Sequence, residues 1–214
     1  MKRNLLLAII LIAVAAAGRL TPHPWNVAPV AAAALLAGAV MPRKWAVSVP
    51  LLAMLISDYF LGAYHLPVML TVYGCFAATA FIGSWAAPRS DSRSESTTGV
   101  SGFKFSHVLG AMPRTGSLSE PSTGVRGMSP IRILIASLSS STIFFLATNF
   151  AVWASADWYE KSWSGLALAY TLAIPFFRNT MLGDLMFTGV MFGVWALATH
   201  YVRLPLPEKR TRAV

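Results

Sequence analysis

A small set of polar and aromatic side chains lies within or beside long apolar stretches of this sequence. The carboxylates of Asp58 and Asp184 can carry a proton or pair with a cationic group, and Asn149 can both donate and accept hydrogen bonds. Ionisable groups in a hydrocarbon-spanning bundle are costly, so by default they indicate a binding site or a pathway. We therefore expect a ligand site, with the candidate residues Asn26, Asp58, Asn149, Trp153, Arg178, Asn179 and Asp184.

Each of these candidates also has a purely structural interpretation. Phe145, Asn149 and Trp153 recur at a spacing of four, so they share one face of a helix. Asn149 there either meets a ligand or makes the kind of interhelical contact that membrane bundles use routinely. Arg178 and Asp184 either act on a ligand or form a structural pair, and Asp184 can also stabilise the positive end of its own helix. Trp153 and its aromatic neighbours either stack on a planar ligand or form an interfacial belt.

The sequence favours binding over catalysis, and we predict no catalytic residue. Asp58 and the later Gly183-Asp184 pair resemble the carboxylates of intramembrane aspartyl proteases, which share a proton. That mechanism needs the two carboxylates within about 6 Å of each other, and the fuller Gly-x-Gly-Asp pattern is absent because residue 181 is Met. There is no phosphate-binding loop, dinucleotide fingerprint or zinc-protease motif. A single cysteine and widely separated histidines give no metal site, so we expect neither metal nor cofactor.

The elements that must position these residues are membrane-spanning helices. Hydrophobic residues make up 56% of the chain and charged residues only 12%, against about 25% charged in soluble domains. The apolar residues gather in long runs, as they do in membrane spans. The net charge of +9 comes from loops and termini, so we expect the lipid bilayer, and no nucleic acid, as a partner.

We predict an all-α polytopic membrane bundle of six transmembrane helices. Residues 1–87 hold the first four, and residues 131–203 hold the fifth and sixth together with a short outer helix that either lies at the interface or re-enters the bundle. That extra helix is predicted because residues 165–177 are too short for a span and end near a proline. Residues 88–130, rich in Ser, Gly, Thr and Arg, are predicted to form a disordered cytoplasmic loop, either regulatory or a tolerated insertion. The expected spans are 4–17, 27–41, 45–61, 66–87, 131–154 and about 180–201, followed by a polar tail at 204–214.

The basic residues predict the orientation of these spans. With both termini cytoplasmic, only Arg19, Lys161 and Arg178 of the 17 Lys and Arg residues lie on the outer side, as the positive-inside rule requires. This count works better if residues 1–17 are a retained first span, although they also fit a cleaved signal peptide. We therefore expect a multi-pass protein of the inner (plasma) membrane. The candidate site residues then gather at the outer ends of the spans, where they would line a pocket open to the outside.

Four separated blocks of residues occur in order near the ends of the predicted spans: Arg19…Pro24-x-Asn26-x-x-Pro29, Ser57-Asp58-x-x-Leu61-Gly62, Thr148-Asn149-Phe150-x-x-Trp153 and Ile174-Pro175-Phe176-Phe177-Arg178-Asn179-x-x-x-Gly183-Asp184. Together they resemble a bacterial family of uncharacterised membrane proteins, known as a domain of unknown function. The resemblance covers roughly residues 4–87 and 131–201. That family is in turn similar to the substrate-binding S components of energy-coupling factor vitamin transporters, in small size, six spans, short first helices and an outward-facing pocket.

The second resemblance implies capture of a vitamin-like micronutrient and its delivery through a transmembrane coupling subunit driven by ATPases. S components contact that subunit through an Ala-x-x-x-Ala spacing on the first helix, which Ala13 and Ala17 match; small residues of this kind allow close helix approach. The ligand itself has no visible signature. If the protein binds one, a cavity of several hundred Å³ should open outward between the third, fifth and sixth spans. If it is instead a structural or assembly protein without a ligand, the same polar groups should contact one another and leave no void.

Overall fold

The computed structural model describes residues 2–22, 26–87 and 128–201, and every regular element within them is an α-helix. The prediction of an all-α fold is therefore confirmed. Helices α3, α4, α5 and α6 are long and apolar enough to cross a membrane, whereas α1 and α2 have shorter apolar runs. The helices are α1 Lys2–Leu20, α2 Val30–Val40, α3 Arg43–Leu61, α4 Leu66–Ala86, α5 Pro130–Ser155 and α6 Trp163–Tyr201.

The outer faces of the long helices carry large apolar side chains. Leu55 of α3, Leu70 of α4, Leu182 and Val194 of α6 are each about 60% exposed. A soluble protein rarely exposes apolar surface of this extent, whereas hydrocarbon tails accept it. Together with the four long helices, this surface indicates a membrane protein.

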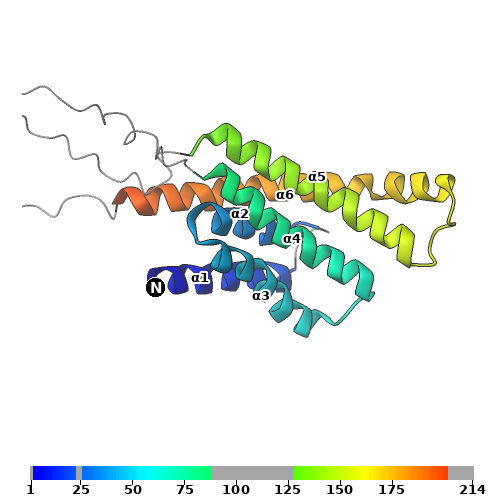
Figure 1. The fold of residues 1–214 in the computed structure, drawn as a ribbon, viewed down its shortest axis with the longest axis horizontal. Coiled ribbons are helices and arrows are strands. Elements are labelled where there is room, and N and C mark those ends of the chain that lie inside the picture. The colour runs from blue at the N-terminus through cyan, green and yellow to red at the C-terminus, as the bar shows by residue number, and fades with distance from the viewer. Residues whose placement is uncertain (1, 23–25, 88–127, 202–214) are drawn as a thin grey trace, which may run out of the picture.

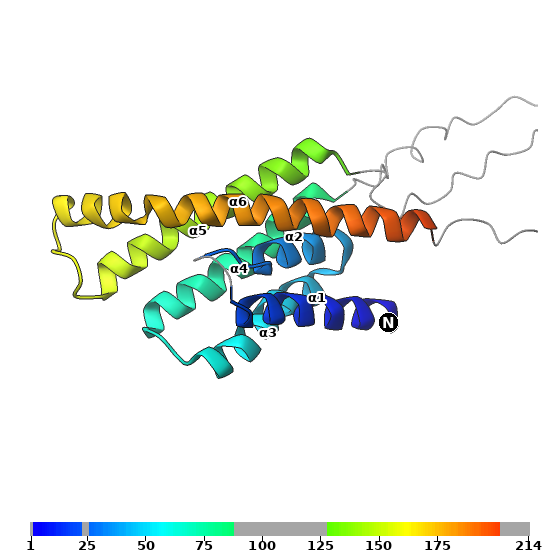
Figure 2. The ribbon, with the colours of Figure 1, turned by 180° about the vertical axis from the view of Figure 1, so that it is seen from behind.

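The helices alternate in direction, so the loops gather at two ends of the bundle. Figures 1 and 2 show the start of α1, the turn between α2 and α3, the end of α4, the start of α5 and the end of α6 at one end. We call this the terminal end. The connections after α1, α3 and α5 lie toward the opposite end, which we call the loop end, and there the α5–α6 hairpin projects beyond the other helices (Figures 1 and 2).

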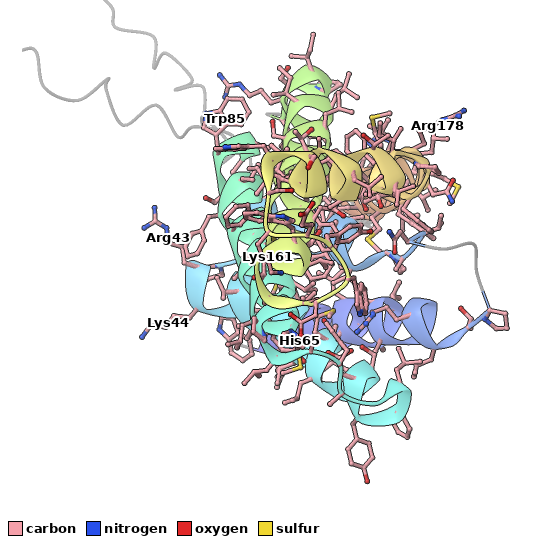
Figure 3. The ribbon with its side chains drawn as sticks, turned by 90° about the vertical axis from the view of Figure 1, so that its right-hand side faces the viewer. Arg43, Lys44, His65, Trp85, Lys161 and Arg178 are labelled. Atoms are coloured by element: carbon pink, nitrogen blue, oxygen red, sulfur yellow. The ribbon has the colours of Figure 1, made fainter. Side chains whose placement is uncertain are left out.

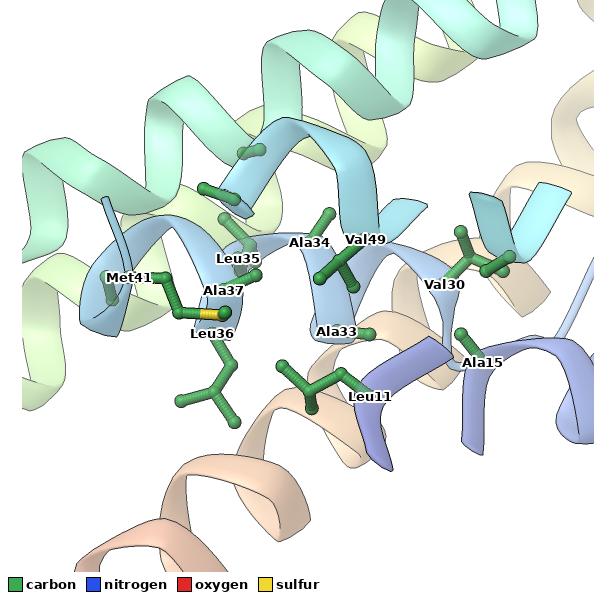
Figure 4. Packing of buried hydrophobic residues seen from close by; sticks show 14 of the residues in the cluster. Leu11, Ala15, Val30, Ala33, Ala34, Leu35, Leu36, Ala37, Met41 and Val49 are labelled. Carbon is green, nitrogen blue, oxygen red and sulfur yellow. The ribbon is translucent and has the colours of Figure 1, made fainter. Parts of the chain in front are cut away.

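Helix α2 is the centre of the fold, because it packs against α1, α3, α4, α5 and α6. Its sequence VAAAALLAGAV is almost entirely buried, and the small alanine side chains let the surrounding helices approach closely. Figure 4 shows how Leu11 and Ala15 of α1 and Val49 of α3 meet this helix. At 11 residues, α2 is about 16 Å long, which is about half of the ~30 Å hydrocarbon thickness. The predicted count of six full spans is therefore not confirmed.

A very close approach in the core joins α2 to α4 through two glycines. A Cβ atom at Gly38 would lie 1.9 Å from the carbonyl oxygen of Ala80, and one at Gly83 would lie 2.2 Å from that of Leu35. Both distances are far inside van der Waals contact, and both clashes involve backbone rather than a movable side chain. Only glycine permits the two backbones to lie this close at these positions.

The structure corrects the prediction for residues 165–177. They do not form a separate interfacial or re-entrant helix, because they belong to α6, a single helix of 39 residues that runs through Pro175. A proline inside a helix removes one backbone hydrogen bond and strains the preceding turn, but it need not end the helix. Membrane helices tolerate proline because neighbouring groups satisfy the freed carbonyl. The prediction that Pro175 marks the end of a helix was therefore wrong.

The predicted loop at residues 88–130 lies outside the described part of the chain except for its last three residues, and the predicted tail at 204–214 lies wholly outside it. Met128 is 8% exposed and belongs to the hydrophobic core, and α5 begins at Pro130. The N-terminal apolar segment is part of helix α1, in which Ala8, Leu11 and Ala15 are buried against the rest of the bundle.

Candidate functional site

A cavity of about 300 Å³ lies inside the bundle and is lined by residues from all six helices and from the connections after α1 and α3. Its residues come from the end of α1, the start of α2, the second half of α3 and the middle of α4, α5 and α6, so it lies away from the terminal end. Asn26, Leu61 and Tyr64 are exposed lining residues and form its rim. A second cavity of about 110 Å³ adjoins it and shares Asn26, Phe144 and Thr180.

Asp58 lies beside this cavity and is held by a cluster of polar groups from three helices. The Nη1 of Arg19, on α1, donates to Asp58 Oδ1 at 2.7 Å and to Ser57 Oγ at 2.6 Å. The hydroxyl of Tyr73, on α4, donates to the other carboxylate oxygen at 3.0 Å. Asp58 is only 8% exposed, so these bonds compensate a charge that would otherwise be costly to bury. The cluster fastens α1, α3 and α4 together.

Asp184 lines the cavity itself. It lies in the middle of α6, is 5% exposed, and its Oδ2 accepts a hydrogen bond of 2.7 Å from Ser141 Oγ on α5. Two further hydroxyl residues, Ser140 and Thr180, face the same cavity. These residues belong to a run of small polar side chains along the α5–α6 contact, where Ser137 and Thr188 also meet at 3.4 Å. Small polar residues are the usual means by which membrane helices pack closely.

Two further candidates, Asn26 and Asn149, lie at the smaller cavity. Asn26 lines both cavities, is exposed, and adopts a left-handed backbone with φ of 62°, a conformation that asparagine tolerates better than most residues. Asn149 lines the smaller cavity, but its amide already donates to the carbonyl oxygen of Phe145 at 2.8 Å. Its side-chain oxygen is the group left to meet a ligand.

Besides Asp58, three further candidates line neither cavity. Trp153 packs at the far end of α5, where its indole N–H donates to the carbonyl oxygen of Glu160 at 3.0 Å and Lys161 lies 6.0 Å from its ring. Arg178 is exposed and projects away from the bundle in Figure 3, so it pairs with neither carboxylate. Asn179 is half-buried on the same helix.

Ala13 and Ala17 lie on the outer face of α1. Both are exposed, together with Ile10 one turn and Leu6 two turns before Ala13. The opposite face of α1 carries Leu11 and is buried in the core. The described helices therefore leave the Ala13–Ala17 face uncovered.

The connection between α3 and α4 places Tyr64 at the rim. Burial raises the pKa of Tyr64 to about 12, the negative charge of Asp58 adds to the shift, and the positive charge of Arg19 opposes it. Tyr64 is thus a neutral hydrogen-bonding group at the mouth of the cavity over the physiological pH range.

Sequence reasoning missed several residues of this site. Arg19 lies at the end of an apolar run, where it looks like a loop charge, and nothing in the sequence pairs it with Asp58, 39 positions later. The Ser140-Ser141 pair carried a signal, because adjacent hydroxyls inside a predicted span imply an interhelical contact. Phe144 has the sequence appearance of a core residue and is found at both cavities only through the fold.

The groups that could hold a metal ion or share a proton can be compared among the described residues. No group of three His, Cys, Asp or Glu side chains among them is placed to hold a metal ion. Asp58 and Asp184 have separate hydrogen-bond partners on different helices. The arrangement is suited to binding a small molecule between an apolar wall and a few polar groups.

Comparison with known proteins adds a family but no activity. No curated protein and no solved structure matches the sequence. The sequence does match, over residues 1–207, a family described as a family of unknown function, DUF6580. This confirms the expected membership of an uncharacterised family, while the similarity to energy-coupling factor S components is left as a proposal. Because the match takes in nearly the whole chain, the protein belongs to the DUF6580 family of unknown function.

Proposed function

We propose that this protein binds a small molecule in its central cavity and serves as a substrate-binding subunit for uptake across the membrane. The observation that carries the proposal is the cavity of about 300 Å³, which combines apolar walls with a buried carboxylate and hydroxyl groups. That volume lies at the lower end of the range for small-molecule sites, so the ligand is small. A micronutrient, as S components capture, has a suitable size.

The distribution of charge supports an orientation for uptake. Arg43, Lys44 and Arg132 belong to helix ends at the terminal end of the bundle, and the positive-inside rule puts such residues in the cytoplasm. The cavity lies away from that end and would then open toward the outside. Both termini would be cytoplasmic in an inner-membrane protein. A cysteine introduced at Asp157 should be labelled by a membrane-impermeant maleimide in intact cells, whereas one introduced at Lys44 should be labelled only after the cells are opened.

The uncovered face of α1 supports a coupling partner. Leu6, Ile10, Ala13 and Ala17 form an exposed strip of apolar and small residues, which permits close packing of a further helix. We propose that a transmembrane subunit bound to ATPases packs here. Replacing Ala13 and Ala17 by leucine should release the ATPases from a mild affinity purification, while leucine at Ala154, exposed on α5, should not.

A structural or assembly role is the second candidate, and the cluster around Asp58 favours it. Each oxygen of the Asp58 carboxylate already accepts a hydrogen bond from within the protein, one from Arg19 and one from Tyr73. We do not propose an enzyme, because a shared-proton mechanism needs two carboxylates that interact directly, and Asp184 has a different partner in Ser141.

Native mass spectrometry of the protein purified in mild detergent separates the two candidates. Under the binding proposal, wild type should carry a small molecule, which Ala31→Leu should exclude because Ala31 lines the cavity. Ala154→Leu is the matched control, since it adds the same atoms at an exposed site, and it should retain the ligand. A folded wild-type protein that never carries a ligand, from any growth medium tested, would contradict the proposal and leave the structural role.

A further inference from the structure

Asp184 has no countercharge among the described residues. Its Oδ2 accepts the hydroxyl proton of Ser141, whereas no described donor reaches Oδ1. The ion pair that the described residues form is the one between Arg19 and Asp58. Yet Asp184 is 5% exposed, in the middle of the longest helix. An uncompensated carboxylate in such a place costs several kcal/mol, so it requires a positive group or a proton from outside the described residues.

The other positive groups near the cavity do not supply that charge. Arg19 lines the cavity, but its Nη1 already bonds Ser57 and Asp58. The start of α2 lies against α6, since a Cβ atom on Gly183 would be 3.0 Å from a methyl carbon of Val27. A helix N-terminus carries only about half an elementary charge, and it makes no hydrogen bond to Asp184.

The hydroxyl oxygens that line the cavity are available as hydrogen-bond acceptors for a ligand. Ser140 donates its proton to the carbonyl oxygen of Ala136, Thr180 to that of Phe176, and Thr79 to that of Cys75. A hydroxyl oxygen keeps its lone pairs after it has donated its one proton. Ser140, Thr180 and Thr79 all line the cavity, so their oxygens and Asp184 Oδ1 together offer a set of acceptors, whereas the donor-bearing lining residues Arg19, Asn26 and Tyr64 belong to the end of α1 and to the connections at the rim.

We propose that the ligand is a small protonated amine, held by its ammonium group at Asp184; this inference rests on the proposed function. An ammonium has three N–H donors and no acceptor, which complements this set. Charge-assisted hydrogen bonds to the carboxylate are the strong contacts, and the Ser140 and Thr180 oxygens accept the remaining protons. Phe76, Phe144 and Met54 form the apolar wall for the body of the molecule, and aromatic faces also favour a nearby cation.

The same ammonium chemistry has two sources, a soluble amine and the ethanolamine head of a phospholipid. The experiment distinguishes them by mass. The compound that co-purifies is detected by native mass spectrometry, extracted, and identified by tandem mass spectrometry. The proteins compared are wild type, Asp184→Asn, Thr180→Val, and the control Asp157→Asn, which changes an exposed carboxylate on a loop in the same way.

We expect wild type and Asp157→Asn to carry a compound with a basic nitrogen. Asp184→Asn removes the charge while keeping the shape, so ligand occupancy should fall about tenfold or more. Thr180→Val keeps the side-chain shape and removes one acceptor, so occupancy should fall by a smaller factor; this variant maintains the test if Asp184→Asn fails to fold. An added probe, 2-phenylethylamine, should raise the thermal stability of wild type more than 2-phenylethanol or 3-phenylpropanoate does.

Several results would overturn the inference. A co-purified ligand without a basic nitrogen would do so while leaving the binding function intact. Unchanged occupancy in folded Asp184→Asn, or in Thr180→Val if the first variant does not fold, would also contradict it, as would equal stabilisation by the alcohol or the acid. No ligand in wild type and no response to any probe would defeat the binding function, and this inference with it. An ammonium-bearing phospholipid would support the chemistry and assign the lipid source.

Discussion

The contact between α2 and α4 gives a sharp test of the fold, through the change Gly38→Ala. The added methyl group would lie 1.9 Å from the carbonyl oxygen of Ala80, where ordinary contact begins at 3.4 Å. To restore ordinary contact, the two backbones would have to separate by the difference between these two distances, about 1.5 Å. Helix α2 cannot move away freely, because it is packed against every other helix. The strain therefore has to spread through the whole core.

The size of the effect follows from two opposing terms. Overpacking a core costs about 1–3 kcal/mol, and the upper part of that range applies because the clash is with backbone. Replacing glycine by alanine in a helix recovers about 0.8–1.0 kcal/mol. We expect Gly38→Ala to lower the free energy of unfolding by about 2 kcal/mol. Gly83→Ala, which meets the carbonyl oxygen of Leu35 at 2.2 Å, should behave alike.

The assay is equilibrium unfolding in mixed micelles of mild detergent and dodecyl sulfate, followed by circular dichroism. Gly74→Ala is the matched control, because it lies on α4 and an added Cβ there has no neighbour within 4 Å; it should be neutral or slightly stabilising. The Gly38→Ala/Gly83→Ala double variant should lose less than the sum of the single losses, since one separation relieves both clashes. A Gly38→Ala protein as stable as the Gly74→Ala control would refute the close packing.

The remaining predictions concern the polar groups. Asp58→Asn should lower the free energy of unfolding by about 3–5 kcal/mol, because it leaves the Arg19 guanidinium, which is 19% exposed, without its countercharge. A double-mutant cycle with Arg19→Met tests this, and additive losses would argue against a stabilising Arg19–Asp58 ion pair. Because the pKa of Tyr64 is raised from 10.0 to about 12, the folded protein holds that proton more tightly than the unfolded chain, so its stabilising contribution is complete below pH 10 and is lost as the pH rises through 12. Tyr64→Phe should then flatten the fall in thermal stability across that interval, and an unaltered fall would contradict the assignment. Trp153→Ala should lower stability at the end of α5, where it breaks the bond to Glu160, but should leave ligand occupancy unchanged; loss of ligand would place Trp153 in the site.

The helical fold could be predicted because long apolar runs in a sequence indicate membrane-spanning helices. The runs at 45–61 and 66–87 correspond closely to α3 and α4. The run at 27–41 gave no sign that α2 is short and central, because an alanine-rich sequence is compatible with either position. Local chemistry makes Pro175 look like a helix boundary, whereas α6 continues through it in the structure. Length and burial depend on the neighbouring helices, which a single sequence does not specify.

The site could be predicted only by residue type. Asp184 is a candidate because it is polar in an apolar run, and Asn26 because it lies in a predicted outer loop beside one; both line the cavity. Arg178 was selected for the same reason as Asp184, but the direction in which a helical side chain points depends on helix rotation, and it projects outward. The partner of Asp58 is Arg19, which belongs to a different helix. Such pairings are set by tertiary packing and have no local signature.

The length of α6 has a mechanical consequence for the cavity. A helix of 39 residues is about 58 Å long, so in a bilayer core of ~30 Å it must tilt or project. Its midpoint is near residue 182, and Thr180 and Asp184 flank that point. A change in tilt of about 10° about the midpoint would swing each tip by about 5 Å but shift these two residues by only about 0.5 Å. Variation in membrane thickness would thus act mainly on the tips of the rod, and the cavity wall would lie at its pivot.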